Sequence, residues 1–209
     1  MSPTYVVTDI ESDGPVPGEH SMLSFASVAM THEGREVSTF EAVLLPLTDA
    51  RPDADTMAWF ETQPEAYAAA TANPCPAAEV FADFVDWVLA LPGKPVFAAH
   101  PIVFDGMWID FYLRKFTNRM LRQGPRDNAP LFYASGICIR SLAAIQLGWP
   151  IWDCLPDRYP PEWLGHHKHS HSAIDDARGY SNLLAKLLGK YIQTQNIVLL
   201  QLCCLYCFL

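Results

Sequence analysis

Acidic side chains and histidines gather at three places in this sequence, in arrangements that suit metal-dependent acid–base chemistry. Asp9 and Glu11 lie two residues apart at the end of an apolar run, and Asp105 follows a second apolar run. The segment KHSHSAIDDARGY, residues 168–180, holds two histidines at one-residue spacing and an aspartate pair. Carboxylates without cysteine partners suit hard cations such as Mg²⁺ or Mn²⁺. The pattern therefore predicts a cation site, provided that the fold brings the three places together.

Each of these groups also has an ordinary structural explanation. Two acidic residues at the end of a strand are most often surface residues, and Asp105 at a helix start is by default an N-cap. Asp175 and Asp176 would complement the dipole of the helix that they begin. Three such groups at three element ends, with a histidine in the preceding loop, favour one shared site.

The elements that would position these residues can be read from the pattern of apolar residues. Residues 4–10, 21–30 and 35–47 are rich in β-forming residues, and Glu33-Gly34 suits a turn, so three antiparallel strands are predicted. Helices then alternate with short apolar strands, among them a strand at 94–100, which indicates a mixed α/β fold. Periodicity predicts that the final amphipathic helix spans 173–191.

Three motifs in this order resemble a known family. They are DIESDG at 9–14, HPIVFD at 100–105 and HSAIDDAR at 171–178. Together they resemble the DEDDh 3′–5′ exonucleases, over roughly residues 4–190. The resemblance implies a ribonuclease H-like α/β fold, in which helices flank a mixed five-stranded sheet whose first three strands are antiparallel.

The resemblance also implies a site and a mechanism. Phosphodiester hydrolysis would use two divalent cations, Mg²⁺ or Mn²⁺. The implied metal ligands are Asp9, Glu11, Asp105 and Asp176. In the family the general base precedes its aspartate by five positions, which selects His171 rather than His169 as the partner of Asp176. Asp175 is then a neighbour that caps the helix or supports the ligands, and His166, His167 and His169 are interpreted as solvated loop residues or phosphate contacts.

The residues that would contact the substrate are assigned with alternatives. The implied partner is the 3′ end of a single strand, and RNA is favoured over DNA because the chain is compact. The candidate contact residues are Ser12, Gly14, Trp59, Arg114 and Arg119. Trp59 would stack on the terminal base, although packing in the core is its alternative. The arginines belong to a basic cluster that would follow the phosphates or simply form a solvated helix face.

The overall charge argues against one class of function, namely binding of nucleic acid through a generally basic surface. The net charge is −9, and a chain this acidic does not attract nucleic acid through its overall field. Two bound cations would reverse the local charge at the site.

The alternatives to an exonuclease that acts on RNA are a deoxyribonuclease for repair or proofreading, a non-catalytic nucleic-acid-binding module on the same fold, and a zinc protein. The zinc ligands would be His166, His167, His169 and His171.

The C-terminal residues are apolar and form a predicted appendage. Residues 1–191 are predicted to be the exonuclease domain, and 192–209 a tail. The run 197–209 would span about 20 Å as a helix, short of the ~30 Å hydrocarbon core, so no transmembrane segment is predicted. A packing or dimer-forming helix is expected, with membrane contact through acylated cysteines as an alternative. The family often forms dimers, which makes a homodimer an expectation. The absence of a signal-peptide pattern at the N-terminus predicts a cytoplasmic location.

Overall fold

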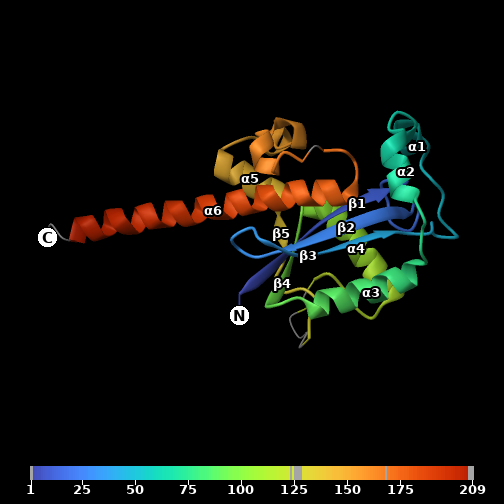
Figure 1. The fold of residues 1–209 in the computed structure, drawn as a ribbon, viewed down its shortest axis with the longest axis horizontal. Coiled ribbons are helices and arrows are strands. Elements are labelled where there is room, and N and C mark those ends of the chain that lie inside the picture. Colours follow the sequence, from blue (N-terminus) through green and yellow to red (C-terminus); the bar gives the residue numbers. More distant parts are fainter. Residues whose placement is uncertain (1, 123, 125–128, 168, 207–209) are drawn as a thin grey trace.

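A five-stranded mixed sheet forms the centre of the computed structural model, which describes residues 2–206 apart from 123, 125–128 and 168. The strands are β1 (Pro3–Ser12), β2 (Met22–Met30), β3 (Glu36–Val43), β4 (Lys94–Ala99) and β5 (Ile137–Cys138). Their order is β3-β2-β1-β4-β5 (Figure 1). The first three strands pair antiparallel, while β4 is parallel to β1 and β5 is parallel to β4. The predicted α/β class and mixed sheet are confirmed.

Helices cover both faces of the sheet. They are α1 (Ala54–Glu61), α2 (Pro64–Thr71), α3 (Ala77–Ala90), α4 (Ile102–Phe116), α5 (Ile139–Leu147) and α6 (Ala173–Tyr206). Val6 and Ile10 of β1 pack into the core on the side of α3 and α4, and Val7 packs into the opposite core with residues of α5 and α6. Figure 1 shows α6 and α3 on opposite sides of the sheet. Because both faces are covered, β1 is almost continuously apolar until its last residues.

The segment between α5 and α6 is irregular, as its prolines predict. It contains three short 3₁₀ helices, Ile151–Asp153, Pro156–Arg158 and Pro161–Leu164. Tyr159 and Leu164 are buried in the same core as α6. This segment therefore packs against α6 and leads into the histidine-containing loop.

The predicted end of the last helix at residue 191 is wrong. The backbone of α6 continues without a break to Tyr206, and its C-terminal end extends away from the other elements (Figure 1). The sequence from 192 onward has no glycine or proline that would end a helix. The division of the chain at 191 into a domain and a tail stays a prediction, as does the homodimer. No helix in the described part of the chain is long and apolar enough to cross a membrane.

Candidate active site

Three element ends meet beside the C-terminal end of β1. The pairing of β1 with β4 ends at Val7 and Ala98, so β1 runs on past the end of β4 by several residues. The first turn of α4 follows β4 closely, and the first turn of α6 packs over β1 and β2. Pockets in α/β proteins commonly form beyond strand ends of this kind.

Asp9, Glu11 and Asp176 come together at this point. One carboxylate oxygen from each residue lies within 4.8 Å of the others. Asp9 and Glu11 point to the same side of β1 because residues two apart in a strand share a face. Asp9 and Glu11 are each 9% exposed, and Asp176 is 3% exposed. Three carboxylates buried at this spacing make a strong candidate cation site.

Asp105 is the fourth acidic residue at the site. The N-cap of α4 is Pro101, and Asp105 lies one turn later, so the capping explanation for Asp105 is wrong. Its side chain is almost fully buried, and its Oδ2 atom has no hydrogen-bond partner among the described residues. A buried carboxylate oxygen without a partner is costly, whereas a cation ligand in this position would be satisfied. The four acidic residues therefore fit a site for divalent cations that prefer oxygen ligands.

The electrostatics of the four acids agree with this assignment. Burial raises the pKa of Asp9 well above its usual value, and repulsion from Asp105, Glu11 and Asp176 raises it further. Burial, with repulsion from Asp176 and Asp105, raises the pKa of Glu11 to about 8. Burial likewise raises the pKa of Asp105 to about 7, although backbone amides oppose the shift. These carboxylates are poorly solvated by the protein alone, and divalent cations would stabilise their ionised forms.

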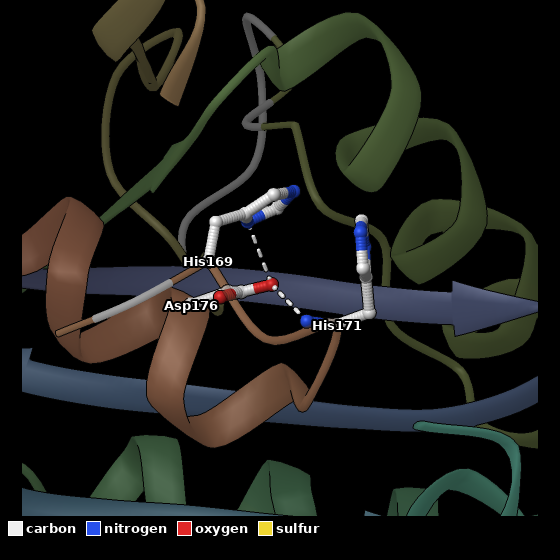
Figure 2. Close-up of side chains that lie close together, drawn as sticks. All are labelled: His169, His171 and Asp176. Atoms are coloured by element: carbon white, nitrogen blue, oxygen red, sulfur yellow. Dashed lines mark hydrogen bonds and ion pairs between the residues drawn. The ribbon is translucent and has the colours of Figure 1, made fainter. Parts of the chain in front are cut away.

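The loop before α6 places both His169 and His171 beside Asp176. The ring of His169 forms the ion pair with Asp176, with Nδ1 2.8 Å from Oδ2 (Figure 2). His171 donates its backbone N–H to the same oxygen at 3.1 Å, and Ser170 donates its own N–H to Oδ1 at 3.1 Å. His169 is thus an exposed loop residue, as expected, and is also a partner of Asp176. His166 is exposed, as expected.

The ring of His171 faces a different neighbour. It meets Trp59 of α1 edge to face, with ring centroids 4.7 Å apart, and it lies 4.3 Å from the ring of His169. Its backbone is in the left-handed region, with φ 56°, and one of its ring nitrogens lies within 4.8 Å of a carboxylate oxygen of Asp176. Burial and the neighbouring His169 lower the pKa of His171, while Asp176 opposes the shift. The ring is therefore neutral at pH 7, as a general base must be.

A cavity of about 250 Å³ opens beside these groups. Its lining includes Asp9, Glu11, Asp105, His169 and His171. It also includes residues to which the sequence assigned no role, namely Arg140, His100 and Tyr180. Arg140 belongs to α5, which is far from the motifs in the sequence. The only feature of the sequence that could have indicated a role for Arg140 is its place as a single basic residue just after a short apolar strand.

His100 forms a rigid wall of this cavity. Its ring is stacked on Tyr180 at a centroid distance of 4.6 Å, and its Nε2 is 2.9 Å from the hydroxyl oxygen of Tyr159. Burial lowers the pKa of His100 to about 4, so it is neutral at pH 7. His100 therefore supports the cavity without adding charge to it.

The residues predicted to contact substrate are not all at the cavity. Ser12 donates a hydrogen bond to the carbonyl of Gly14, and Gly14 is packed under the ring of His20. Arg114 pairs with Asp110, and Arg119 donates to the carbonyl of Ala129. Neither arginine lines the cavity. Arg114 lies in the last turn of α4, about 13 Å along the helix axis from Asp105, and Arg119 lies beyond the end of this helix. Trp59, 37% exposed, lies beside His171 instead of in the core.

The sequence alone gives no match to known proteins, whereas the fold does. Neither family models nor curated proteins match the sequence. The nuclease domain of 3′hExo, a DEDDh family member bound to rAMP, matches with a TM-score of 0.65 over 90% of this chain and 93% of that chain, at 13% identity. A 3′-exonuclease that recognises the 3′ end of the histone mRNA stem-loop matches with a TM-score of 0.64 over 90% of this chain and 83% of that chain, at 12% identity.

A third similar structure comes from a larger enzyme. The zinc-bound complex of E. coli exonuclease I with single-stranded DNA matches with a TM-score of 0.61 at 18% identity. The match covers 93% of this chain and 43% of that one, so this chain spans less than half of exonuclease I. At these identities the likeness shows the fold, and the fold is the one that the motifs predicted.

Proposed function

We propose that this chain, which has the fold of the DEDDh 3′-exonucleases, is a metal-dependent hydrolase that shortens single-stranded nucleic acid from its 3′ end. The observation that carries the proposal is the meeting of Asp9, Glu11 and Asp176, with carboxylate oxygens within 4.8 Å of one another. Asp105, whose Oδ2 has no hydrogen-bond partner among the described residues, lines a cavity with Asp9 and Glu11. Buried like charges at this spacing are costly unless cations lie among them.

The four acids would hold two divalent cations, Mg²⁺ or Mn²⁺. Bound there, the cations would lower the pKa of water and stabilise charge on the leaving 3′-oxygen. Asp9 experiences repulsion from each of the other three acids, and it would help to hold the cations, as the family resemblance implies. Glu11 and Asp176 would complete the site on the water side, and Asp105 would hold the cation on the leaving-group side.

His171 is assigned as the general base. A ring nitrogen of His171 would accept a proton from the attacking water, and the lowered pKa of the ring keeps this nitrogen unprotonated at neutral pH. Its ring is only partly buried, so the accepted proton can leave to solvent. Trp59, in edge contact with His171, would stack on the terminal base.

RNA is the proposed substrate class, in a cytoplasmic setting. Two structures of similar fold hold or recognise ribonucleotides, namely rAMP and a stem-loop of histone mRNA. DNA is the second candidate, because exonuclease I has a similar fold and was solved with single-stranded DNA. A non-catalytic binding module would need none of the four buried acids, so the presence of all four in this chain favours catalysis.

The test uses the full chain with Mn²⁺ and 5′-labelled single-stranded RNA and DNA of one sequence. We expect a ladder that shortens from the 3′ end, faster on RNA, and no cleavage of a circular strand. Asp9→Ala should abolish the ladder, while Asp86→Asn, an exposed acid on α3, should leave it unchanged. Cleavage of circles, or equal rates for wild type and Asp9→Ala, would overturn the proposal.

A further inference from the structure

His169, His171 and Asp176 form a second group of potential metal ligands beside the four acids. One donor atom from each lies within 4.8 Å of the others. Nδ1 of His169 is already 2.8 Å from Oδ2 of Asp176, and the two imidazole rings stand next to each other (Figure 2). Asp176 belongs both to this group and to the group with Asp9 and Glu11.

The donor atoms of this second group suit a different class of cation. Two imidazole nitrogens and one carboxylate oxygen are ligands that Zn²⁺ binds well, whereas Mg²⁺ and Mn²⁺ prefer oxygen. Tetrahedral zinc at its usual bond lengths places neighbouring donor atoms about 3.4 Å apart. The observed 2.8 Å contact of His169 with Asp176 would open slightly, and the ring of His171 would rotate inward.

The surroundings of the group allow such a movement. The side chain of His169 is 34% exposed, and that of Asp176 is 1% exposed, so the group has an open side and a buried anion. Backbone amides of Ser170 and His171 hold Asp176 in place. The cavity lined by Asp9, Glu11 and Asp105 is also lined by His169 and His171, so an ion can reach the group from the same opening as substrate.

We propose that His169, His171 and Asp176 bind a zinc-class ion, and that this ion blocks the exonuclease reaction. The second half rests on the proposed function. An ion bound to the ring nitrogen of His171 occupies the lone pair that would accept the proton from water, and it also draws on the carboxylate that Asp176 offers to the other site. His169, the first histidine of the H-x-H pair, thereby gives the chain a zinc-sensitive active site.

Zinc binding is tested first, without reference to activity. Zn²⁺ is titrated by calorimetry into the full chain in saturating Mg²⁺, so that oxygen-preferring sites are already occupied. We expect one Zn²⁺ per chain, and a loss of affinity of at least about tenfold in His169→Ala. His166→Ala is the matched control, since His166 lies in the same loop and outside the group; it should bind as wild type does. Equal affinity in wild type and His169→Ala would overturn the site.

X-ray absorption at the zinc edge identifies the ligands directly. The bound ion should show two imidazole ligands in wild type and one in His169→Ala, in protein whose circular dichroism is unchanged. A spectrum with oxygen ligands alone would place zinc among the four acids and overturn the proposal.

Inhibition is measured last, as each variant's rate with zinc divided by its own rate without zinc. His169→Ala should need at least about ten times more Zn²⁺ for half inhibition than wild type or His166→Ala. Zinc that binds through two imidazoles yet leaves the rate unchanged would overturn the inhibitory role. A chain that binds zinc in this way and degrades no nucleic acid would contradict the proposed function and leave the binding site standing.

Discussion

The ring of His169 holds the carboxylate of Asp176, with Nδ1 2.8 Å from Oδ2. His171 reaches the same carboxylate only through its backbone N–H. The two histidines of the H-x-H pair therefore have different roles. His169 orients a proposed metal ligand, and His171 presents its ring toward Trp59 and the cavity.

This division predicts unequal effects of the two alanine variants. Loss of a general base costs about 10²- to 10⁴-fold in rate, so His171→Ala should lower the single-turnover rate by that amount. Loss of a side chain that orients a metal ligand costs about 10- to 100-fold, so His169→Ala should lower it less at saturating Mn²⁺. A larger loss in His169→Ala than in His171→Ala would reassign the base to His169.

The pH dependence of the rate gives a second prediction. Burial and the neighbouring His169 lower the pKa of His171, and a general base must be unprotonated. In the pH profile of kcat/KM, the midpoint of the acidic limb should therefore lie below pH 6.5, which is the usual pKa of histidine. His169→Ala removes the second of these two causes, so its acidic limb should move to higher pH. A limb that stays in place, or moves to lower pH, would contradict the electrostatic coupling of the two rings.

The buried acids predict an unusual dependence of stability on pH in EDTA. The pKa of Glu11 is raised to about 8 and that of Asp105 to about 7, so the folded state binds more protons than the unfolded state over this range. Their stabilising contribution is present at low pH and is lost as pH rises through these values. His100, with its pKa lowered to about 4, acts in the opposite sense only below pH 6.5. Between pH 6.5 and 8 the free energy of unfolding should therefore fall.

Denaturant unfolding at several pH values tests this directly. Glu11→Gln should be more stable than wild type at pH 8 in EDTA and should show a flatter pH profile. Mn²⁺ should stabilise wild type more at pH 8 than at pH 6.5, and should stabilise Glu11→Gln less. The same variant should lose about 100-fold or more in rate, since even residues that only support metal ligands cost 10- to 100-fold. A wild-type protein whose stability in EDTA rises from pH 6.5 to 8 would contradict the shifts.

Much of this site could be predicted because its geometry follows from local rules. The two-residue spacing of Asp9 and Glu11 fixes their shared side of β1, and the short distance from β4 to Asp105 fixes the place of α4. The role of His169 could not be predicted, because its contact with Asp176 depends on the path of an irregular loop, which neither periodicity nor spacing encodes. Arg140 was missed because α5 reaches the cavity only through tertiary packing.

The secondary structure likewise contains elements that could be predicted from the sequence and elements that could not. Strands β1 to β3 follow from their alternating β-rich pattern, and the irregular segment before α6 follows from its prolines. Strand β5 has only two residues, too few for a pattern of its own. The end of α6 was misplaced because the amphipathic pattern gives way to the polar residues 193–196 and then to an apolar run from 197, and such a change marks a different environment rather than the end of a helix.

Arg140 predicts a change in the salt dependence of substrate binding. It is the arginine among the described residues that line the cavity, and its Nε donates to the carbonyl of Ile151 at 2.9 Å. Its terminal nitrogens have no hydrogen bond to a described residue, so they can contact phosphate. Arg140→Gln should weaken binding of an oligomer and lower the slope of log K against log salt by about 1. Arg114→Gln is the control, because Arg114 pairs with Asp110 outside the cavity. Equal slopes for wild type and Arg140→Gln would exclude a phosphate contact.

Trp59 offers the sharpest test of how the chain holds a 3′ end. Its ring is 37% exposed on α1, beside the buried Phe60 and in edge contact with His171. Stacking of a base on an aromatic ring contributes about 1–3 kcal/mol. If the terminal base stacks on Trp59, Trp59→Ala should raise KM about 5- to 150-fold with a smaller change in kcat. Trp59→Phe should retain most of the affinity.

The contact with His171 creates a rival role for Trp59, which a second substrate separates. An oligomer whose 3′-terminal nucleotide lacks its base has nothing to stack. If Trp59 acts by stacking, wild type and Trp59→Ala should show the same KM on this abasic oligomer, because variant and substrate each remove the same interaction. If Trp59 instead orients the ring of His171, the variant should lower kcat equally on both oligomers with KM unchanged. Steady-state kinetics on the two substrates therefore decides between a base-stacking residue and a residue that positions the general base.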